Sequence, residues 1–266
     1  MFKERLLSGI VLMIIAIVTI VLGGNVLFAT VLAISLIGMM ELFRVFKFEK
    51  KPVAMIGYAG CIGYYFTLLF AKESLIMYFI FYLLVIMIFY VVSFPRYDTS
   101  HVTVLFFGLF YVAVMLSYIY QVRMLDDGAY LVWLIFISAW GSDTCAYCVG
   151  KLIGKHKVTP HLSPKKSVEG CIGGVVGAAL IGVIYAAIFH ENIIGFQSVY
   201  LAFALIGGCG SVISQIGDLA ASAIKRQHEI KDYGKLIPGH GGILDRFDSI
   251  IFTAPIVYYL VSYFAA

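Results

Sequence analysis

Nine apolar stretches, each about 20 residues long, dominate the sequence and leave it few ways to fold. Their approximate bounds are 6–24, 26–43, 53–71, 74–94, 102–120, 130–150, 170–190, 198–222 and 248–265. About 20 mostly apolar residues let an α-helix cross the hydrocarbon core of a bilayer. Hydrophobic residues make up 62% of the chain and charged residues only 13%, too little polar surface to coat a water-soluble globule of 266 residues. We therefore predict an all-α integral membrane protein with about nine transmembrane helices.

The distribution of basic residues predicts the topology. The first stretch resembles a secretory signal peptide, but it lacks a small-x-small cleavage site and a second apolar stretch follows at once, so we interpret it as a retained helix. With nine spans and a cytoplasmic N-terminus, 17 of the 19 Lys and Arg residues fall in cytoplasmic segments. Only Lys72 and Arg123 fall on the other side. Because cytoplasmic loops carry such an excess of positive charge, this topology is favoured.

The chain changes character at about residue 130. Residues 1–130 consist of apolar stretches with short connections and almost no ionisable group inside a stretch, so we interpret them as a scaffold. Residues 131–266 carry most of the remaining polar chemistry, including the two longest hydrophilic loops, 151–169 and 226–247. No soluble domain separates the two regions. We expect one continuous membrane domain whose second region is catalytic.

An acidic residue inside a predicted span is informative, because an ionised side chain there costs about 2.5–3.5 kcal/mol on insertion scales. Asp143 lies near the end of the sixth stretch, either in a site or solvated at the interface beside a lysine of the next loop. Asp218 belongs to a polar stripe in the eighth stretch, whose steps of three and four residues define one helical face. The stripe comprises Ser211, Ser214, Asp218, Ser222 and Lys225. Hydrogen bonding between helices would explain the serines but not Asp218, so the presence of Asp218 favours a functional site.

The segment 238-PGHGGILDRFDS-249 places Asp245 and Asp248 on one face at the start of the ninth stretch. Acidic residues there can simply cap the helix, but capping leaves the glycines around His240 unexplained. Glycine lets backbone approach a ligand closely. Mg²⁺ typically binds one or two carboxylates together with waters and substrate phosphates. We expect Asp218 to meet Asp245 and Asp248 at the cytoplasmic ends of their helices and to hold Mg²⁺ with them, with or without a second cation.

The loop 151–169 contains five lysines and could be a positive anchor for anionic lipids. However, the run Ser163-Pro164-Lys165-Lys166-Ser167 directly precedes a helix predicted to begin near Gly170, which favours a phosphate-binding role. The sequence has no Walker motif and no G-x-S-x-G elbow. His240 has no Ser or Cys partner placed for nucleophilic catalysis, so it either shapes the turn or takes part in the chemistry.

The segment from Ser222 to Asp248 resembles the signature of the phosphatidate cytidylyltransferases, also called CDP-diacylglycerol synthases. That signature reads S-x-x-K-R, four residues, K-D-x-small, and then P-x-H-G-G-x-x-D-R-x-D. Here it is filled by Ser222, Lys225, Arg226, Lys231, Asp232, Gly234, Pro238, His240, Gly241, Gly242, Asp245, Arg246 and Asp248. The Ser-Pro-Lys-Lys-Ser run and the segment around Asp143 also look like the family's.

The resemblance implies a Mg²⁺-dependent nucleotidyl transfer in phospholipid biosynthesis, CTP + phosphatidate → CDP-diacylglycerol + pyrophosphate. It implies a homodimer in the cell membrane, with a polar cavity open to the cytoplasm and to lipid, and no nucleic-acid partner. The residues that would be catalytic are Asp218, Asp245 and Asp248 at the metal, Lys225, Arg226 and Lys231 at phosphates, and His240. Substrate contacts would come from Asp143, Ser163, Lys165, Lys166, Ser167, Ser222, Gly241, Gly242 and Arg246.

Two alternatives remain open at this point. A CTP-dependent lipid-alcohol kinase would use the same nucleotide. An ion-coupled transporter would use Asp143 and Asp218 to bind the coupling ion. A transporter would not need the lysine-rich loop and the Gly-His-Gly-Gly turn, and it would be expected to show internal repeat symmetry, which the sequence lacks.

Overall fold

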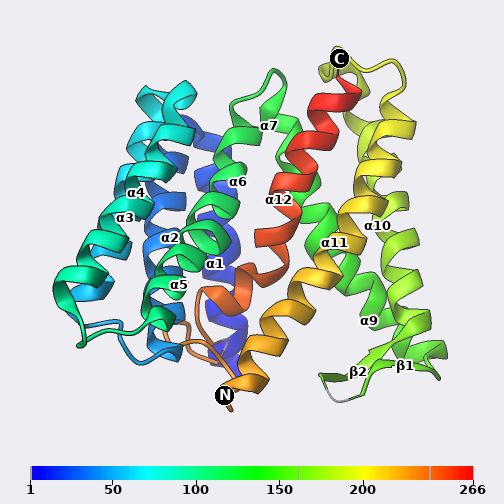
Figure 1. Ribbon diagram of the computed structural model, residues 1–266. Helices are drawn as coiled ribbons and strands as arrows, with labels where there is room; N and C mark the ends of the chain where they lie inside the picture. The colour runs from blue at the N-terminus through cyan, green and yellow to red at the C-terminus, as the bar shows by residue number, and fades with distance from the viewer. Residues whose placement is uncertain (1, 161, 240, 266) are drawn as a thin grey trace.

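Nine helical spans lie side by side in the part of the chain that the structure describes (Figure 1), as the sequence predicts. The structure is a computed structural model that describes residues 2–160, 162–239 and 241–265. Eight spans are at least 18 residues long and apolar enough to cross a membrane, and the described apolar part of the first span is Ser8–Leu22. The first four spans are α1 (Phe2–Leu22), α2 (Gly24–Val45), α3 (Pro52–Phe70) and α4 (Leu75–Ser93), the last preceded by the short helix η1 (Lys72–Ser74).

The fifth and sixth spans are composite helices. The fifth comprises α5 (Thr99–Gly108), the π-helical stretch η2 (Leu109–Val114) and α6 (Met115–Arg123). The sixth comprises α7 (Gly128–Leu131), α8 (Trp133–Phe136), the π-helical stretch η3 (Ile137–Gly141) and α9 (Ser142–Ile153). The last three spans are α10 (Val168–Phe189, followed by η4, His190–Asn192), α11 (Val199–Gln227) and α12 (Leu244–Phe264).

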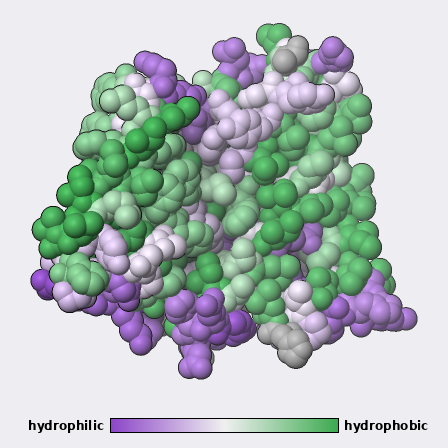
Figure 2. Space-filling model, viewed as in Figure 1, coloured by the Kyte–Doolittle hydropathy of each residue, from purple (hydrophilic) through white to green (hydrophobic). Residues whose placement is uncertain are grey.

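Most of the charged side chains gather at one end of the helices. The connections 46–51, 94–98, 154–167 and 228–243 all lie at the end where the chain begins, the lower end in Figure 1, which we call the basic face. From Arg44 onward, every Lys and Arg except Lys72 and Arg123 lies in or beside these connections. On the face shown in Figure 2, hydrophilic residues border the molecule at both ends and the surface between them is mostly hydrophobic. This pattern is that of a chain whose middle lies in hydrocarbon.

The connection 154–167 is a small β-hairpin, which the sequence analysis did not predict. Strand β1 (Lys157–Thr159) pairs antiparallel with strand β2 (Ser163–Ser167). Ser167 then caps α10, because its Oγ accepts a hydrogen bond from the backbone N–H of Gly170 at 3.2 Å. The hairpin is therefore anchored directly at the start of a membrane helix.

Small residues let the C-terminal helices approach closely. The face of α10 that packs against α9 and α11 is formed by a stripe at four-residue steps, Gly170, Gly174, Ala178, Gly182 and Ala186, all buried. Helices in membranes associate through such stripes because backbones can then come into contact. α11 packs in turn against α12, so that the four helices α9 to α12 bring the predicted site residues close to one another.

Candidate active site

The polar stripe on α11 has two parts with different roles. Toward the middle of the helix, the Ser211 and Ser142 Oγ atoms lie 2.6 Å apart, which joins α11 to α9. Gln215 Nε2 donates to the carbonyl of Cys171 at 3.1 Å, which joins α11 to α10. The Ser211 contact is a hydrogen bond between helices, the role that the sequence analysis allowed for the serines, whereas no hydrogen bond is formed by the buried Ser214 Oγ with the described residues. Asp218 and Lys225, closer to the basic face, are engaged instead with charged groups of other elements.

Ion pairs connect the hairpin, α11 and α12 at the basic face. Lys166 Nζ, at the end of β2, lies 2.5 Å from Asp218 Oδ2 on α11. Lys225 Nζ, in the last turn of α11, lies 2.9 Å from Asp245 Oδ1 and 3.9 Å from Asp248 Oδ2 on α12. The fold therefore brings together the lysine-rich run, the polar stripe and the two aspartates of the last span.

Three carboxylates form the acidic part of this site. Asp143 on α9 and Asp218 are each close enough to Asp248 for electrostatic interaction. Asp143 also interacts with Lys166 and with Arg246. A cavity of about 270 Å³ opens beside these groups, and among its walls are four predicted substrate residues, Asp143, Lys165, Lys166 and Ser167. Ser163, at the other end of β2, does not line this cavity.

Glu169 holds the lysine-bearing hairpin in place. Its Oε2 accepts hydrogen bonds from the backbone N–H groups of Lys155 at 3.1 Å and His156 at 3.2 Å, and its Oε1 lies 2.6 Å from His156 Nδ1. Since Glu169 belongs to the first turn of α10, these contacts fold the hairpin back onto that helix. Lys165 and Lys166 consequently lie at a helix start, the arrangement expected of a phosphate-binding segment.

Asp245 and Asp248 have different surroundings although they share a helical face. Asp245 is only 7% exposed, and its Oδ2 accepts hydrogen bonds from the backbone N–H groups of Tyr233 at 2.8 Å and Gly242 at 3.0 Å. Its Oδ1 accepts from Lys225. Asp248 Oδ1 accepts from the N–H of Ser249 at 2.8 Å, while its Oδ2 has the more distant Lys225. The contacts of Asp245 favour a role in fixing the loop, whereas Asp248 has more capacity left for a ligand.

Glu41 of α2 is a buried partner of the site that the sequence analysis missed. It is 1% exposed, and its Oε1 and Oε2 accept hydrogen bonds from the N–H groups of Ile243 at 3.0 Å and Leu244 at 2.9 Å. A carboxylate in this position caps the start of α12 and complements its dipole. The sequence signal was present, because a glutamate inside an apolar stretch is expected to be paired or functional.

In the loop 228–243, carboxylates approach the backbone so closely at three positions that a β-carbon would collide with them. A β-carbon on Gly234 or Gly242 would overlap the Glu41 carboxylate, and one on Gly241 would lie 2.8 Å from Asp245 Oδ2. Gly241 also has φ +91°, a conformation that glycine adopts without strain. The sequence analysis attributed this glycine cluster to a bound ligand, and the contacts seen here are with the protein's own acids.

Tyr233 fixes the same loop from its other side. Its hydroxyl donates to the Ala221 carbonyl on α11 at 3.1 Å, and its ring lies 5.4 Å from Lys225 Nζ. Burial, with smaller contributions from nearby ionisable groups, raises the pKa of Tyr233 well above its ordinary value. The hydroxyl therefore stays protonated and remains a donor at physiological pH.

Comparison with known proteins agrees with this arrangement. The model of the cytidylyltransferase family matches residues 3–264. The chain belongs to this family. Among its relatives, the phosphatidate cytidylyltransferase of Bacillus subtilis (strain 168) is 30% identical over 275 residues, which cover 99% of this chain and 98% of the relative. That of Staphylococcus aureus (strain COL) is 32% identical over 267 residues, covering 96% and 97%, and that of Staphylococcus haemolyticus (strain JCSC1435) is 29% identical over 264 residues, covering 96% and 97%.

The remaining predicted residues of the family signature lie around the ion pairs. Arg226 at the end of α11 and Lys231 in the following loop are exposed on the basic face, and Ser222 is partly buried one turn before them. Arg246 is exposed at the start of α12. His240 lies outside the described residues, so its role stays a prediction.

The acidic side chains of the site offer oxygen donors to a metal ion. Within the described ranges, no group of three or more His, Cys, Asp or Glu side chains converges in metal-binding geometry. Mg²⁺ needs only one or two carboxylates when substrate phosphates and water complete its shell. Asp218 and Asp248, with Asp143 nearby, fit that requirement. Asp245 fits it less well, because backbone N–H groups and Lys225 already engage both of its oxygens.

Proposed function

We propose that the protein transfers the cytidylyl group of CTP to phosphatidate, giving CDP-diacylglycerol and pyrophosphate. The observation that carries the proposal is the meeting of the hairpin lysine, the α11 stripe and the α12 aspartates in one charged site at the edge of a membrane domain. The family membership and the names of the relatives support the same reaction. Neither a lipid-alcohol kinase nor a transporter is favoured by these matches.

The reaction requires stabilisation of the negative charge on the phosphates more than it requires a strong base. A phosphate monoester has a second pKa of about 6, so phosphatidate is mostly a dianion at pH 7 and needs no deprotonation. One of its oxygens bonds to the α-phosphorus of CTP, and the bond from that phosphorus to the bridging oxygen breaks, so that pyrophosphate leaves with its electron pair. Cations held in place offset the charge that develops on the leaving group. This requirement agrees with the absence of a Ser-His-Asp arrangement.

Each group of side chains has a part in this scheme. Lys165, Lys166 and Ser167 hold phosphates of the nucleotide at the start of α10, and Lys225 contacts a phosphate from α11, with Arg226 and Lys231 at the exposed edge. Asp245 and Glu41 act as positioning residues, since they hold Lys225 and the start of α12. Asp218 and Asp248 would hold Mg²⁺, which when bound supplies Lewis-acid stabilisation of the phosphate oxygens.

The wider setting follows from the same proposal. Because CTP is a cytoplasmic nucleotide, we infer that the basic face lies in the cytoplasm and that the protein lies in the cell membrane. The excess of Lys and Arg on that face agrees with this orientation. A homodimer remains an expectation from the family resemblance, to be measured by light scattering of the protein–detergent complex.

The direct test is an assay of purified protein with CTP labelled in the α-phosphate and dispersed phosphatidate, with and without Mg²⁺. Metal-dependent appearance of label in CDP-diacylglycerol is expected. A lipid-alcohol kinase would instead phosphorylate diacylglycerol and release CDP, and a transporter would transfer no label to lipid. Either of these results would overturn the proposal.

Paired asparagine variants separate the two aspartates of α12. We expect Asp248→Asn to lower kcat by about 10²-fold or more, as for loss of a group that stabilises transition-state charge, while thermal stability stays near that of the wild type. Asp245→Asn should lower both activity and stability, because an amide cannot replace all of its hydrogen bonds. Asp126→Asn, an exposed site on the opposite face, is the matched control. Normal turnover by Asp248→Asn would remove this residue from the mechanism.

A further inference from the structure

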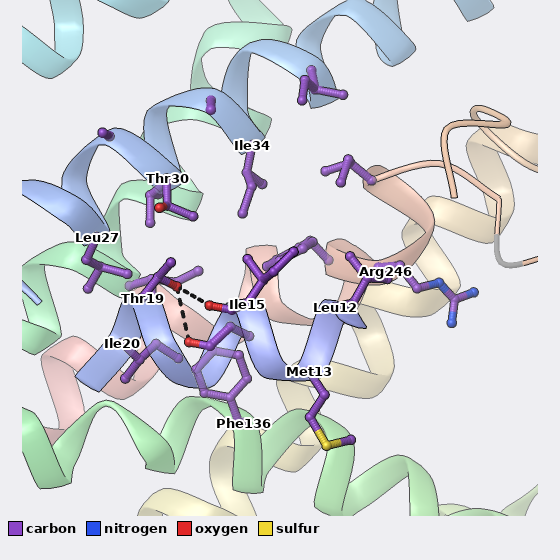
Figure 3. A pocket seen from close by; sticks show the side chains of 18 of the residues that line it. Leu12, Met13, Ile15, Thr19, Ile20, Leu27, Thr30, Ile34, Phe136 and Arg246 are labelled. Carbon is purple, nitrogen blue, oxygen red and sulfur yellow. Dashed lines mark hydrogen bonds between the residues drawn. The ribbon is translucent and has the colours of Figure 1, made fainter. Parts of the chain in front are cut away.

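A large apolar cavity lies between α1 and α2, away from the charged cavity beside the hairpin. Its volume is about 660 Å³, within the range of about 300–1,000 Å³ common for small-molecule sites. The walls come from α1 and α2, with contributions from α6, α8, η3 and the start of α12 (Figure 3). We call it the α1–α2 cavity. Nothing in the proposed chemistry of nucleotide transfer uses it.

The lining has one charged residue, at one end. Thr19 and Thr30 are its hydroxyl-bearing residues, and both donate to carbonyls of their own helices, Thr19 to Ile15 at 2.8 Å and Thr30 to Val26 at 2.8 Å. Arg246 is the charged lining residue, and its guanidinium extends away from the apolar side chains (Figure 3). The cavity thus has apolar walls and a cationic end, the shape of a site for an amphipathic anion.

The length of the cavity corresponds to one leaflet of a bilayer. On α1 its lining runs from Gly9 to Ile20, twelve residues that rise about 16 Å along the helix, and the hydrocarbon core of a bilayer is about 30 Å thick. The Gly9 end lies at the basic face, because the neighbouring Ser8 Oγ donates to the carbonyl of Pro238 in the loop 228–243. The other end is fixed by Arg123, whose Nε donates to the carbonyl of Ile20 at 3.0 Å.

Arg246 connects the cavity to the charged site. It lines the α1–α2 cavity, and it also lies in the first turn of α12 between Asp245 and Asp248 of the charged site. A phosphate held by Arg246 would therefore lie beside the carboxylates proposed to hold Mg²⁺, while a chain attached to it extends along the apolar walls toward the middle of the membrane. Phosphate contacts of this kind suit the planar, bidentate guanidinium.

We propose that the α1–α2 cavity binds one acyl chain of the phosphatidate substrate, with Arg246 contacting the lipid phosphate. The proposal rests on the proposed function and extends it to the N-terminal helices. Lipid tails are about as apolar as the cavity walls, so binding here gains little from the hydrophobic effect. The cavity instead positions the lipid phosphate, and its shape sets which chains are accepted.

A binding measurement tests the proposal without any turnover. The chain has two tryptophans, and Trp140 lines the cavity, so Trp133→Phe leaves a single fluorescent reporter there. In that background, phosphatidate with brominated acyl chains should quench Trp140 more strongly than brominated phosphatidylcholine at the same mole fraction in micelles. Arg246→Gln should reduce the difference between the two lipids. Equal quenching by both lipids would show that ordinary bilayer lipid fills the cavity. An absence of quenching by either lipid would indicate that protein occupies it. Each of these two results would overturn the proposal.

Filling the cavity tests its effect on selectivity. Ala33 on α2 lines the cavity, and Ala33→Phe should lower kcat/KM for phosphatidate with 18-carbon chains at least fivefold relative to a six-carbon analogue, with the KM for CTP unchanged. Ala187→Phe, exposed on α10, is the matched control and should leave the ratio unchanged. Equal effects of Ala33→Phe on both chain lengths would refute the acyl site. Failure of the wild type to form CDP-diacylglycerol would instead refute the proposed function. The quenching measurement requires no turnover, so it would still test lipid binding in that case.

Discussion

Replacing Glu41 by Gln should destabilise the protein, although Glu41 lies about 200 residues before the signature in the sequence. Both carboxylate oxygens accept backbone hydrogen bonds, so the substitution places an amide N–H₂ against the N–H of Ile243 or Leu244. Loss of one hydrogen bond to a charged group, with a buried donor left unsatisfied, costs about 2–4 kcal/mol. For a chain of this size each kcal/mol corresponds to about 2–4 °C, which predicts a fall in Tm of roughly 5–15 °C.

The assay is thermal unfolding of purified protein in detergent, followed by nucleotide transfer at a temperature where the variant remains folded. Turnover should also fall, because Ile243 and Leu244 begin the helix that carries Asp245 and Asp248. Glu73→Gln is the matched control, since Glu73 is exposed in η1. A Glu41→Gln protein with an unchanged Tm and unchanged kcat would refute the capping role and the argument that α2 positions the site.

Three further substitutions test the packing of the charged site. Lys225→Met leaves the buried Asp245 carboxylate without its cation. The free energy of unfolding should fall by about 3–5 kcal/mol, and turnover should be lost. Gly242→Ala should strongly reduce the yield of folded protein, because a β-carbon at this position would overlap the buried Glu41 carboxylate. Gly208→Ala on α11 is the control: a β-carbon fits there, so the yield should be unchanged or slightly higher. Tyr233→Phe removes one hydrogen bond and should cost about 0.5–1.5 kcal/mol while KM for CTP stays unchanged.

The sequence was sufficient for the framework of the molecule. All nine apolar stretches form helical spans, since about 20 apolar residues have no other stable arrangement in a bilayer. The periodic stripe on α11 and the lysine-rich run were predicted from spacing and charge, and they meet through Lys166 and Asp218. These features depend on local pattern, which a sequence displays directly.

Features that depend on distant contacts were not predictable in the same way. Glu41 and its partners are separated by more than 200 residues, so the apolar pattern around Glu41 could mark it as unusual but could not identify what it binds. The hairpin of 157–167 was missed because its strands are short and depend on Glu169 for their position. The region interpreted as scaffold supplies most of the walls of the α1–α2 cavity.

The two aspartates of α12 show why spacing alone cannot assign roles within a site. A three-residue separation places Asp245 and Asp248 on one helical face, which favours a shared ligand. Their difference arises from the loop 228–243, which folds over the first turn of α12 and directs two N–H groups at Asp245. Asp248, one turn further along, is beyond the reach of that loop and faces Lys225, Asp218 and Asp143. Asp245 therefore fixes the loop, whereas Asp248 keeps an oxygen whose nearest cation, Lys225, is 3.9 Å away, and this difference depends on how the loop folds and not on the motif itself.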